Sequence, residues 1–379
     1  MNEAGGTVDV VVVGAGIAGA SAAWALAEHL DVVLVEREPA AGYHATGRSA
    51  SVLSATSGPY EVCALAAASR PFFEAPPEGF GEVALLAPRG LWWVGQAADS
   101  ATLDRFAVEA AAVTSVRRMT AAETLARLPG FRHDAVAGGS VAEPEAMAID
   151  TAALLDGYLR GLRRRGARLL TTAEAIRATP TGAGWTVTVG GSAVRCRHVV
   201  NAAGAWADEF AARAGVDPLG LQPHRRTAAL VPAPATVAGW PLVMDIAGRY
   251  YVEPESGGLL LSPADETPAE PGDARPEETD VAWALHRLDE ATELGVQRVL
   301  RSWAGLRTFA PDRRPVVGED PRARGFWWLA GQGGAGIKTA PALAALLAAQ
   351  ILGVARPPTP VDEARLGPAR LRTPSAAPG

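Results

Sequence analysis

The apolar positions before residue 36 follow first the pattern of a strand, then that of a helix, and then that of a strand again. Residues 8–13 are a nearly continuous run of valine, typical of a parallel strand that is buried on both faces. A glycine-rich turn and a predicted helix at 20–30 follow. A second apolar run at 32–35 then ends at Glu36. The order of strand, helix and strand predicts a βαβ unit.

The glycines of the turn have separate physical roles in such a unit. Gly14 permits the tight turn, Gly16 lets a pyrophosphate approach the backbone, and Gly19 lets helix and strand pack closely. The N-terminus of the helix offers unpaired N–H groups and a partial positive charge. Glu36, at the tip of the second strand, is placed to accept hydrogen bonds from ribose hydroxyls. The whole arrangement predicts a dinucleotide site rather than an ordinary glycine-rich turn.

Strand-like and helical segments follow one another further along. Residues 81–94 and 135–144 have an extended pattern, and a helical region lies between them at 102–128. A strong helix is predicted at 151–165, with Asp150 as its N-cap.

The second half of the chain is richer in strand signals. Residues 222–310 alternate apolar and polar positions between turn signals, which favours an antiparallel sheet. Residues 268–276 are expected to form a surface loop without evident chemistry, and the tail after Pro357 to be loosely held. Further strands are predicted at 168–171, 185–189 and 199–204.

A second glycine-rich turn occurs near the other end of the chain. Residues 331–338 join an apolar run to a helix beginning near Ala340, which again would place N–H groups against a ligand. The two turns lie more than 300 residues apart, which indicates one long ligand that touches both ends of the chain.

Composition narrows the class of protein. A chain of 379 residues is expected to form two domains, and its net charge of −6 gives no footprint for nucleic acid. No stretch is long enough to span a bilayer, and no signal peptide is recognisable at the start. Cys63 and Cys196 lack metal-ligand spacing, so we expect buried thiols in a reducing cytoplasm and no metal site. Lys338 is the one lysine among 35 basic residues, which makes a chemical role for it more plausible.

At this point the motifs resemble a known family. The chain is similar to FAD-dependent amine and amino-acid oxidoreductases of the D-amino-acid oxidase, glycine oxidase and sarcosine oxidase group, and within it most of all to the bacterial D-arginine dehydrogenase branch. The residues that carry the resemblance lie at 36–38, 42–50, 201–206, 219–223, 303–307 and 332–337.

The resemblance implies an α/β fold with two domains. A Rossmann-like FAD-binding domain of the glutathione-reductase type would take residues 1–80, 146–214 and 311–365. A substrate domain built on a mixed, largely antiparallel sheet would take 81–145 and 215–310. Residues 366–379 would form a C-terminal tail.

The resemblance also implies which residues contact FAD. The cofactor is expected to be noncovalent, although His44 lies in a segment where a covalent flavin–histidine bond is conceivable. The expected contacts are Gly14, Gly16, Ile17, Ala18, Gly19, Glu36, Arg37, Thr46, Gly47, Arg48, Ser49, Ala50, Ala175, Ala203, Gly204, Trp206, Gly331, Gly333, Gly334, Ala335, Gly336, Ile337 and Lys338.

The implied reaction is hydride transfer from the carbon bearing the amine to flavin N5, after which the imine hydrolyses. No side-chain base is required, because the neutral amine reacts. Arg307 is the leading substrate ligand, since a planar guanidinium matches a carboxylate. The other residues expected at the substrate are Tyr251, Arg226, Lys338, Leu91, Ser54, Ser57 and Gly334.

Residues that differ from those of the D-arginine enzyme narrow the class of substrate. Leu91 stands where the D-arginine enzyme has the glutamate that meets the guanidinium, so we expect an apolar pocket unless Glu82 or Asp245 takes over. The substrate is then a hydrophobic D-amino acid, or an N-substituted glycine with Lys338 at its carboxylate. Oxygen or a quinone would accept the electrons. Two other classes stay open, an NAD-linked Rossmann dehydrogenase and a flavin-binding protein without turnover.

Overall fold

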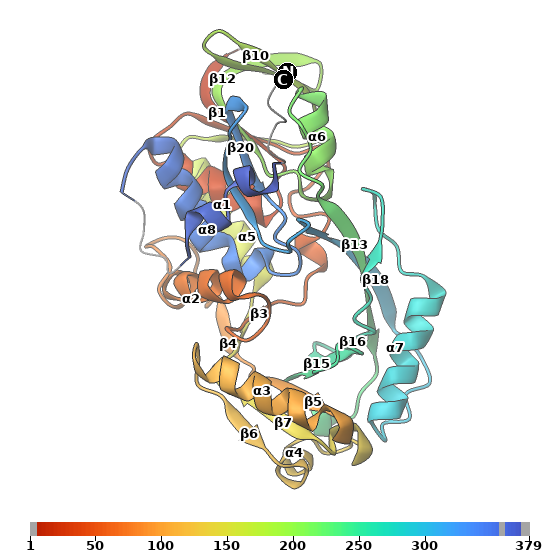
Figure 1. Cartoon of the computed structure of the whole chain (residues 1–379). Coiled ribbons are helices and arrows are strands. Elements are labelled where there is room, and N and C mark those ends of the chain that lie inside the picture. The colour runs from red at the N-terminus through yellow and green to blue at the C-terminus, as the bar shows by residue number, and fades with distance from the viewer. Residues whose placement is uncertain (1–5, 356–360, 373–379) are drawn as a thin grey trace, which may run out of the picture.

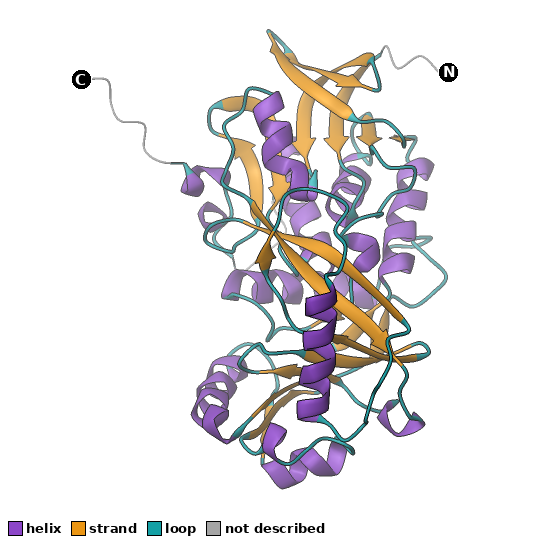
Figure 2. Cartoon of the chain, turned by 90° about the vertical axis from the view of Figure 1, so that its right-hand side faces the viewer, coloured by secondary structure: helices purple, strands orange, loops and turns teal. Residues whose placement is uncertain are grey.

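Two β-sheets of different construction organise the chain. The computed structural model describes residues 6–355 and 361–372. Figure 1 shows the first sheet, with its helices, at one end of the molecule and the second sheet at the other. Figure 2, turned by 90°, shows a long pair of strands crossing from one part to the other.

The first sheet is parallel at its centre. Its order is β10-β11-β12-β1-β2-β9, with β20 beside β12 and β19 beside β20. β1 pairs in parallel with both β12 and β2, while β10 and β11 form an antiparallel hairpin. The bounds are β1 (Thr7–Val13), β2 (Val32–Val35), β9 (Arg168–Leu170), β10 (Ala175–Thr181), β11 (Gly184–Val189), β12 (Ser192–Asn201), β19 (Val316–Asp320) and β20 (Ala323–Ala330).

Helices cover both faces of this sheet, which explains the continuous valine run of β1. Val10 and Val12 belong to one core cluster with the helices α1 (Ile17–Leu26), α5 (Thr151–Arg164) and α8 (Gly336–Leu352). Val11 and Val13 alternate to the opposite core, where α6 (Ala207–Arg213) contributes Phe210. A further helix, α2 (Tyr60–Glu74), packs against α8.

The second sheet is mixed and largely antiparallel, as the sequence predicted. Its order is β17-β13-β16-β15-β14-β5-β7-β6, and β18 pairs with β13. The parallel pair is β5 with β14. The bounds are β5 (Leu91–Gly95), β6 (Arg117–Met119), β7 (Gly139–Glu143), β13 (Gln222–Val231), β14 (Leu242–Asp245), β15 (Tyr251–Glu255), β16 (Gly258–Ser262), β17 (Thr267–Pro268) and β18 (Arg301–Phe309), with the helices α3 (Ser100–Ala111), α4 (Ala121–Arg127) and α7 (Glu278–Ala291) beside them.

A third, small sheet lies where the chain passes between the two larger ones. It consists of β3 (Val52–Leu53), β8 (Met147–Ile149) and β4 (Leu86–Pro88), all antiparallel. The strands of the first sheet fall within the segments expected to bind FAD, and those of the second within the segments expected to bind substrate. The domain boundaries themselves stay a prediction.

Several element predictions need correction. Helix α1 begins at Ile17 rather than near residue 20, because Gly16 adopts the extended N-cap conformation directly after the turn. The helix predicted at 102–128 is broken by β6, and a new helix begins where Thr120 and Glu123 form a capping box. The helices α2 and α7 were not predicted. The predicted cap of α5 is confirmed, because Asp150 Oδ1 accepts a hydrogen bond from the Ala153 N–H at 2.8 Å.

The expectation of a loosely held tail is wrong for residues 361–372. Leu366 is fully buried in the core under α8, and its carbonyl accepts a hydrogen bond from the Val317 N–H at 3.1 Å. Arg370 donates from Nε to Asp312 Oδ2 at 2.8 Å, and Arg372 forms an ion pair with buried Asp320. Residues 356–360 and 373–379 lie outside the described part.

We predict that Leu366→Ala lowers the free energy of unfolding by about 2–5 kcal/mol, because it leaves a cavity in the main core. Leu300, which is 45% exposed, provides the matched control, and Leu300→Ala should cost less than about 1 kcal/mol. Urea unfolding followed by circular dichroism measures both changes. Equal effects would show that the segment around Leu366 does not dock on the core.

Candidate active site

Three adjoining cavities form a continuous cleft between the two larger sheets. We call them the outer, middle and inner cavities, with volumes of about 180, 80 and 320 Å³. Thr46 and Gly333 line both the outer and the middle cavity. Tyr251 and Arg307 line both the middle and the inner one. The cleft therefore suits a long ligand with a smaller molecule at its inner end.

The outer cavity is built around the first glycine turn. Gly14 has φ +97°, and a Cβ on it would lie 2.5 Å from the carbonyl oxygen of Ala202. A Cβ on Gly19 would lie 1.8 Å from the Gly14 carbonyl oxygen, so only glycine lets α1 pack this closely. Glu36 accepts a hydrogen bond from the Ala15 N–H at 2.8 Å, which holds its carboxylate beside the turn.

Side chains from distant segments complete the outer cavity. The Arg37 guanidinium lies 3.9 Å from the ring centre of Trp206. The imidazole ring of His44 also packs against the Trp206 ring. His44 Nε2 lies 2.9 Å from Glu38 Oε1, and this contact lowers the pKa of Glu38. Thr46 Oγ1 accepts from the Ile17 N–H at 2.9 Å, which ties the segment to the start of α1.

Most residues expected at the cofactor line the cleft. Gly14, Gly16, Ile17, Ala18, Glu36, Arg37, Thr46, Arg48, Ala175, Ala203, Gly204, Trp206, Gly333 and Gly336 line the outer cavity. Ser49, Ala50, Gly334 and Ile337 line the middle one, and Ala335 and Lys338 line the inner one. Gly19, Gly47 and Gly331 are not among the lining residues. A Cβ on Gly47 would lie 2.7 Å from the Gly42 carbonyl oxygen, so close backbone packing requires a glycine there.

The loop at 268–276 was expected to lack chemistry, and the structure corrects that view. Gly272 and Ala274 line the outer cavity. Arg48 donates to the carbonyls of Ala274 and Ala304 at 2.8 and 2.9 Å and forms an ion pair with Asp273. This loop was missed because its place over the cleft depends on an arginine more than 200 residues away.

The second glycine turn brings α8 onto strand β18. The Gly333 N–H donates to the Thr308 carbonyl at 2.8 Å, and a Cβ on Gly333 would lie 2.1 Å from the Phe309 ring. A Cβ on Gly334 would lie 3.1 Å from Arg307 Nη1. Because glycine has no side chain, position 334 leaves space for the Arg307 guanidinium.

Arg307 lines the cleft without a polar partner. Among residues 6–355 and 361–372 no hydrogen bond or ion pair is formed by its half-buried guanidinium, and burial lowers its pKa. Taking a guanidinium out of water without an anion is costly, so the arrangement favours an anionic ligand at this point.

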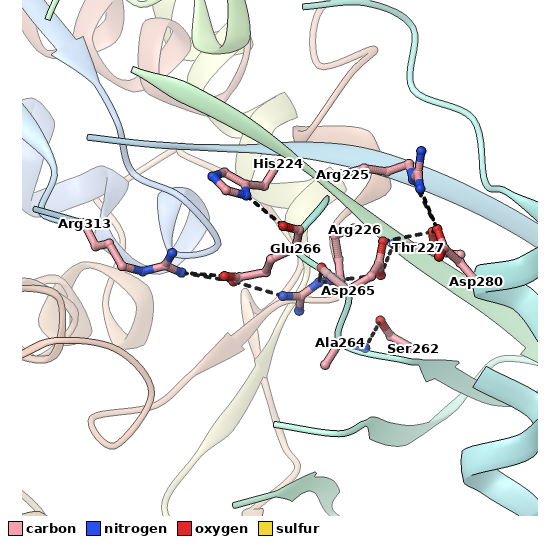
Figure 3. Close-up of polar contacts among 10 residues, drawn as sticks. All are labelled: His224, Arg225, Arg226, Thr227, Ser262, Ala264, Asp265, Glu266, Asp280 and Arg313. Atoms are coloured by element: carbon pink, nitrogen blue, oxygen red, sulfur yellow. Dashed lines mark hydrogen bonds and ion pairs between the residues drawn. The ribbon is translucent and has the colours of Figure 1, made fainter. Parts of the chain in front are cut away.

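The neighbouring arginines are already paired, as Figure 3 shows. Arg226 donates from Nη2 to Glu266 Oε1 at 3.1 Å, and Arg313 donates from Nη2 to Glu266 Oε2 at 2.9 Å. Arg225 turns to the other side of β13, where it meets Asp280 at 2.9 Å. Only one of the two adjacent arginines faces the cavity, as strand alternation predicted.

Lys338 and the two predicted serines occupy a different arrangement from the one expected. Lys338 lines the inner cavity, but its Nζ donates to the carbonyls of Ser54 and Ser57 at 3.2 and 2.5 Å. Burial lowers the pKa of Lys338. Ser57 lines the cavity, whereas Ser54 does not, because its hydroxyl donates to buried Glu143 at 2.6 Å. Glu143 and Lys338 thus hold the loop around Ser54 from opposite sides.

The pocket is not simply apolar, and its wall differs from the predicted one. Leu91 is fully buried beside Leu242, its partner on the neighbouring strand, in a cluster that includes Tyr251, and it is not among the residues that line the inner cavity. Glu82 is exposed, and Asp245 is bound to Arg249 at 2.6 Å in a separate pocket. Val52, Leu242, Met244 and Ile337 supply apolar surface, but the acids Glu253 and Glu266 and four basic residues also line the inner cavity.

Glu253 was missed by the sequence prediction. It is 5% exposed, and burial raises its pKa from 4.5 to about 7, against the opposing effect of Arg89. Tyr251 is two positions earlier on β15, so strand alternation places both side chains on the cavity face. That spacing was the available signal.

The cleft fits a dinucleotide that extends toward Arg307, because glycine turns at the starts of α1 and α8 both border it. Such a site beside a parallel α/β sheet is typical of dinucleotide-dependent oxidoreductases. The chain belongs to the FAD dependent oxidoreductase family (DAO), whose model matches residues 9–350. Within the described residues no group of His, Cys, Asp or Glu forms a metal site. No helix of that part of the chain is long and apolar enough to cross a membrane.

Individual relatives agree with this assignment. The glycine oxidase of Geobacillus kaustophilus (strain HTA426) is 28% identical over 361 residues, which are 91% of this chain and 92% of that protein. A crystal structure of glycine oxidase from Geobacillus kaustophilus has a TM-score of 0.83 at 25% identity, over 95% and 98% of the two chains. L-proline dehydrogenase from P. horikoshii shares the fold, with a TM-score of 0.85 at 20% identity over 97% and 98%. These matches do not support the finer resemblance to D-arginine dehydrogenase.

We predict that Glu253→Gln stabilises the ligand-free protein more at pH 8.5 than at pH 5. A buried carboxyl with a raised pKa lowers the stability of the fold as the pH rises from its unfolded pKa of 4.5 to its folded pKa of about 7, and glutamine does not titrate. A shift to about 7 corresponds to a difference of about 3 kcal/mol between the two pH values. Urea unfolding at both pH values measures it. An equal effect of the substitution at pH 5 and 8.5 would contradict the raised pKa.

Proposed function

We propose that this protein oxidises the C–N bond of an amino acid whose carboxylate binds Arg307. One observation carries the proposal. A half-buried guanidinium faces the inner end of a dinucleotide cleft, and no described acid forms an ion pair with it. A planar carboxylate would supply two parallel hydrogen bonds and the missing charge. The likeness to glycine oxidase, at 28% identity, supports an amino acid as the ligand.

FAD, when bound, supplies the acceptor for the two electrons taken from the substrate. The chain would hold it with the first glycine turn and Glu36 at the nucleotide half, and with the turn around Gly333 at the other half. Binding is proposed to be noncovalent. Cys63 and Cys196 are not among the residues that line the three cavities, and Nε2 of His44 is engaged by Glu38.

The side chains of the inner cavity position the substrate. Arg307 would fix the carboxylate, and Tyr251, on β15 of the same sheet, borders both the middle and inner cavities. Lys338 keeps one N–H donor beyond the two that bind carbonyls. The proposed reaction starts from the neutral amine, so no side chain is assigned the role of a base.

Two substrate classes fit this anchor, a D-amino acid and an N-substituted glycine. The likeness to glycine oxidase favours the second, in which the glycine part is oxidised and leaves as glyoxylate. A panel of D-amino acids and N-alkylglycines, scored by anaerobic bleaching of the flavin, tests the proposal. Failure of the whole panel to bleach the flavin would contradict amino-acid oxidation.

We predict that Arg307→Ala lowers kcat/KM by about 10- to 150-fold, because a charged pair with the carboxylate is lost. FAD content should stay normal, since the guanidinium lies at the substrate end of the cleft. Arg301→Ala is the control, because Arg301 lies on the same strand but is exposed. Steady-state kinetics and the flavin absorbance per chain measure both. Unchanged kinetics would remove Arg307 from the substrate site.

We predict that acid precipitation releases the flavin from the purified protein. The supernatant should be yellow and contain FAD, and the pellet should be colourless. A pellet that keeps the flavin through washing would show a covalent bond, and His44→Ala would then test whether His44 forms it.

A further inference from the structure

Glu253 is a buried carboxyl that borders the inner cavity without a hydrogen-bond donor. It lies on β15 between Val252, which belongs to the core behind the sheet, and Pro254. Its own side chain and that of Tyr251 share the opposite face, which lines the cavity. In the described part of the chain no hydrogen bond reaches its carboxylate.

The one cation near Glu253 does not satisfy it. Arg89 Nε lies 3.7 Å from Glu253 Oε2, which is too far for a hydrogen bond, and that Nε itself has no hydrogen-bond partner in the described structure. Leu242 and Met244 supply the apolar surface beside it on β14. A carboxyl in such surroundings is unfavourable by itself, which indicates that the missing donor comes from a ligand.

The other acid that lines the inner cavity is already committed. Glu266 accepts hydrogen bonds from Arg226 and from Arg313, whose Nη2 contacts both carboxylate oxygens, as Figure 3 shows. A cationic ligand would have to displace two guanidinium groups there. Glu253 therefore is the acid with room for a new donor.

The position of Glu253 sets the length of the ligand. Tyr251 and Glu253 are two residues apart on a strand, a spacing of roughly 6.5 Å. Tyr251 lines the middle cavity together with Arg307. Its interaction with Arg307 partly offsets the lowering of the guanidinium pKa by burial. A substrate anchored by its carboxylate at Arg307 and lying along β15 thus reaches Glu253 with an arm of about four or five atoms.

We propose that Glu253 is a specificity-determining residue that binds an amino group at the far end of the substrate's arm. This inference rests on the proposed function, because Arg307 fixes the other end of the same molecule. The apolar stem of the arm would lie on Leu242 and Met244, and its ammonium group would meet the carboxylate of Glu253. The acid that the D-arginine enzyme has where this chain has Leu91 would thus be replaced by one on another strand.

Two matched pairs of substrates test this inference on the FAD-loaded enzyme. D-lysine is compared with D-2-aminoheptanoic acid, and N-(2-aminoethyl)glycine with N-propylglycine, so that each pair differs only in a terminal amine or methyl group. We expect kcat/KM to favour the amine by about tenfold or more in whichever pair is oxidised. Glu253→Gln should abolish the preference. Glu255→Gln, an exposed position on the same strand, should keep it.

The pH dependence of the preference gives a second readout. Charged groups around Glu253 are Arg89, Glu255 and, across the cavity, Arg226, Glu266, Arg307, Arg313 and Lys338. The ionised form of Glu253, which prevails above about pH 7, binds an ammonium group best. The ratio of kcat/KM within a pair should therefore rise with pH through that value in the wild type. It should stay flat in Glu253→Gln.

The outcomes test the proposed function and the role of Glu253 separately. If none of the four compounds bleaches the flavin while another amino acid of the panel does, the inference is overturned and the function stands; if the whole panel fails, both are overturned. If the compounds of a pair are oxidised but the methyl compound matches or exceeds the amine in the wild type, the inference is overturned while the function stands. A preference that survives Glu253→Gln overturns it as well. The wild-type comparison does not depend on the variant folding.

Discussion

The close contact between the second glycine turn and strand β18 is the constraint on which the cleft depends. The Gly333 N–H donates to the Thr308 carbonyl, a Cβ on Gly333 would clash with the Phe309 ring, and a Cβ on Gly334 would press on the Arg307 guanidinium. This contact joins the start of α8, which packs on the parallel sheet, to a strand of the other sheet. The outer, middle and inner cavities are continuous because the two parts of the chain meet there.

The same contact explains why a cation can remain without a partner in the inner cavity. Strand β18 presents Arg307 beneath the bare backbone of Gly334, while the neighbouring arginines on β13 and at position 313 are neutralised by acids. The protein thus carries an electrostatic cost that a carboxylate ligand would offset. Glu253 presents the complementary case, a buried acid facing the same cavity. Arg307 without an ion pair and Glu253 without a hydrogen-bond donor are the two features on which the proposed binding of an amino acid with an amino-terminated arm rests.

The features that the sequence predicted well are those with local causes. Each glycine of the first turn has a steric role that its own spacing reveals, and the valine run of β1 shows burial on both faces. The break between α3 and α4 was missed although the Thr120 capping box marks it, because the apolar positions continue through it. The anchored segment around Leu366 was missed because its stability comes from tertiary contacts with β19 and α8.

The substrate site was harder to predict for a similar reason. Arg307 and Tyr251 follow from motifs, but the direction and partners of a side chain depend on neighbouring strands. Ser54 binds buried Glu143, and Leu91 is buried beside Leu242, so neither is among the residues that line the cavity. Glu253 lines the cavity because β15 turns its odd-numbered residues inward, and its spacing of two from Tyr251 is the signal that was missed.

A crystal structure of the FAD complex with benzoate, a carboxylate that cannot be oxidised, tests the central claim most directly. The account predicts that FAD occupies the outer and middle cavities, that the carboxylate of benzoate makes two hydrogen bonds to the Arg307 guanidinium, and that the ring extends toward Leu242 and Met244. A carboxylate bound elsewhere in the cleft, with Arg307 still unpaired, would contradict it.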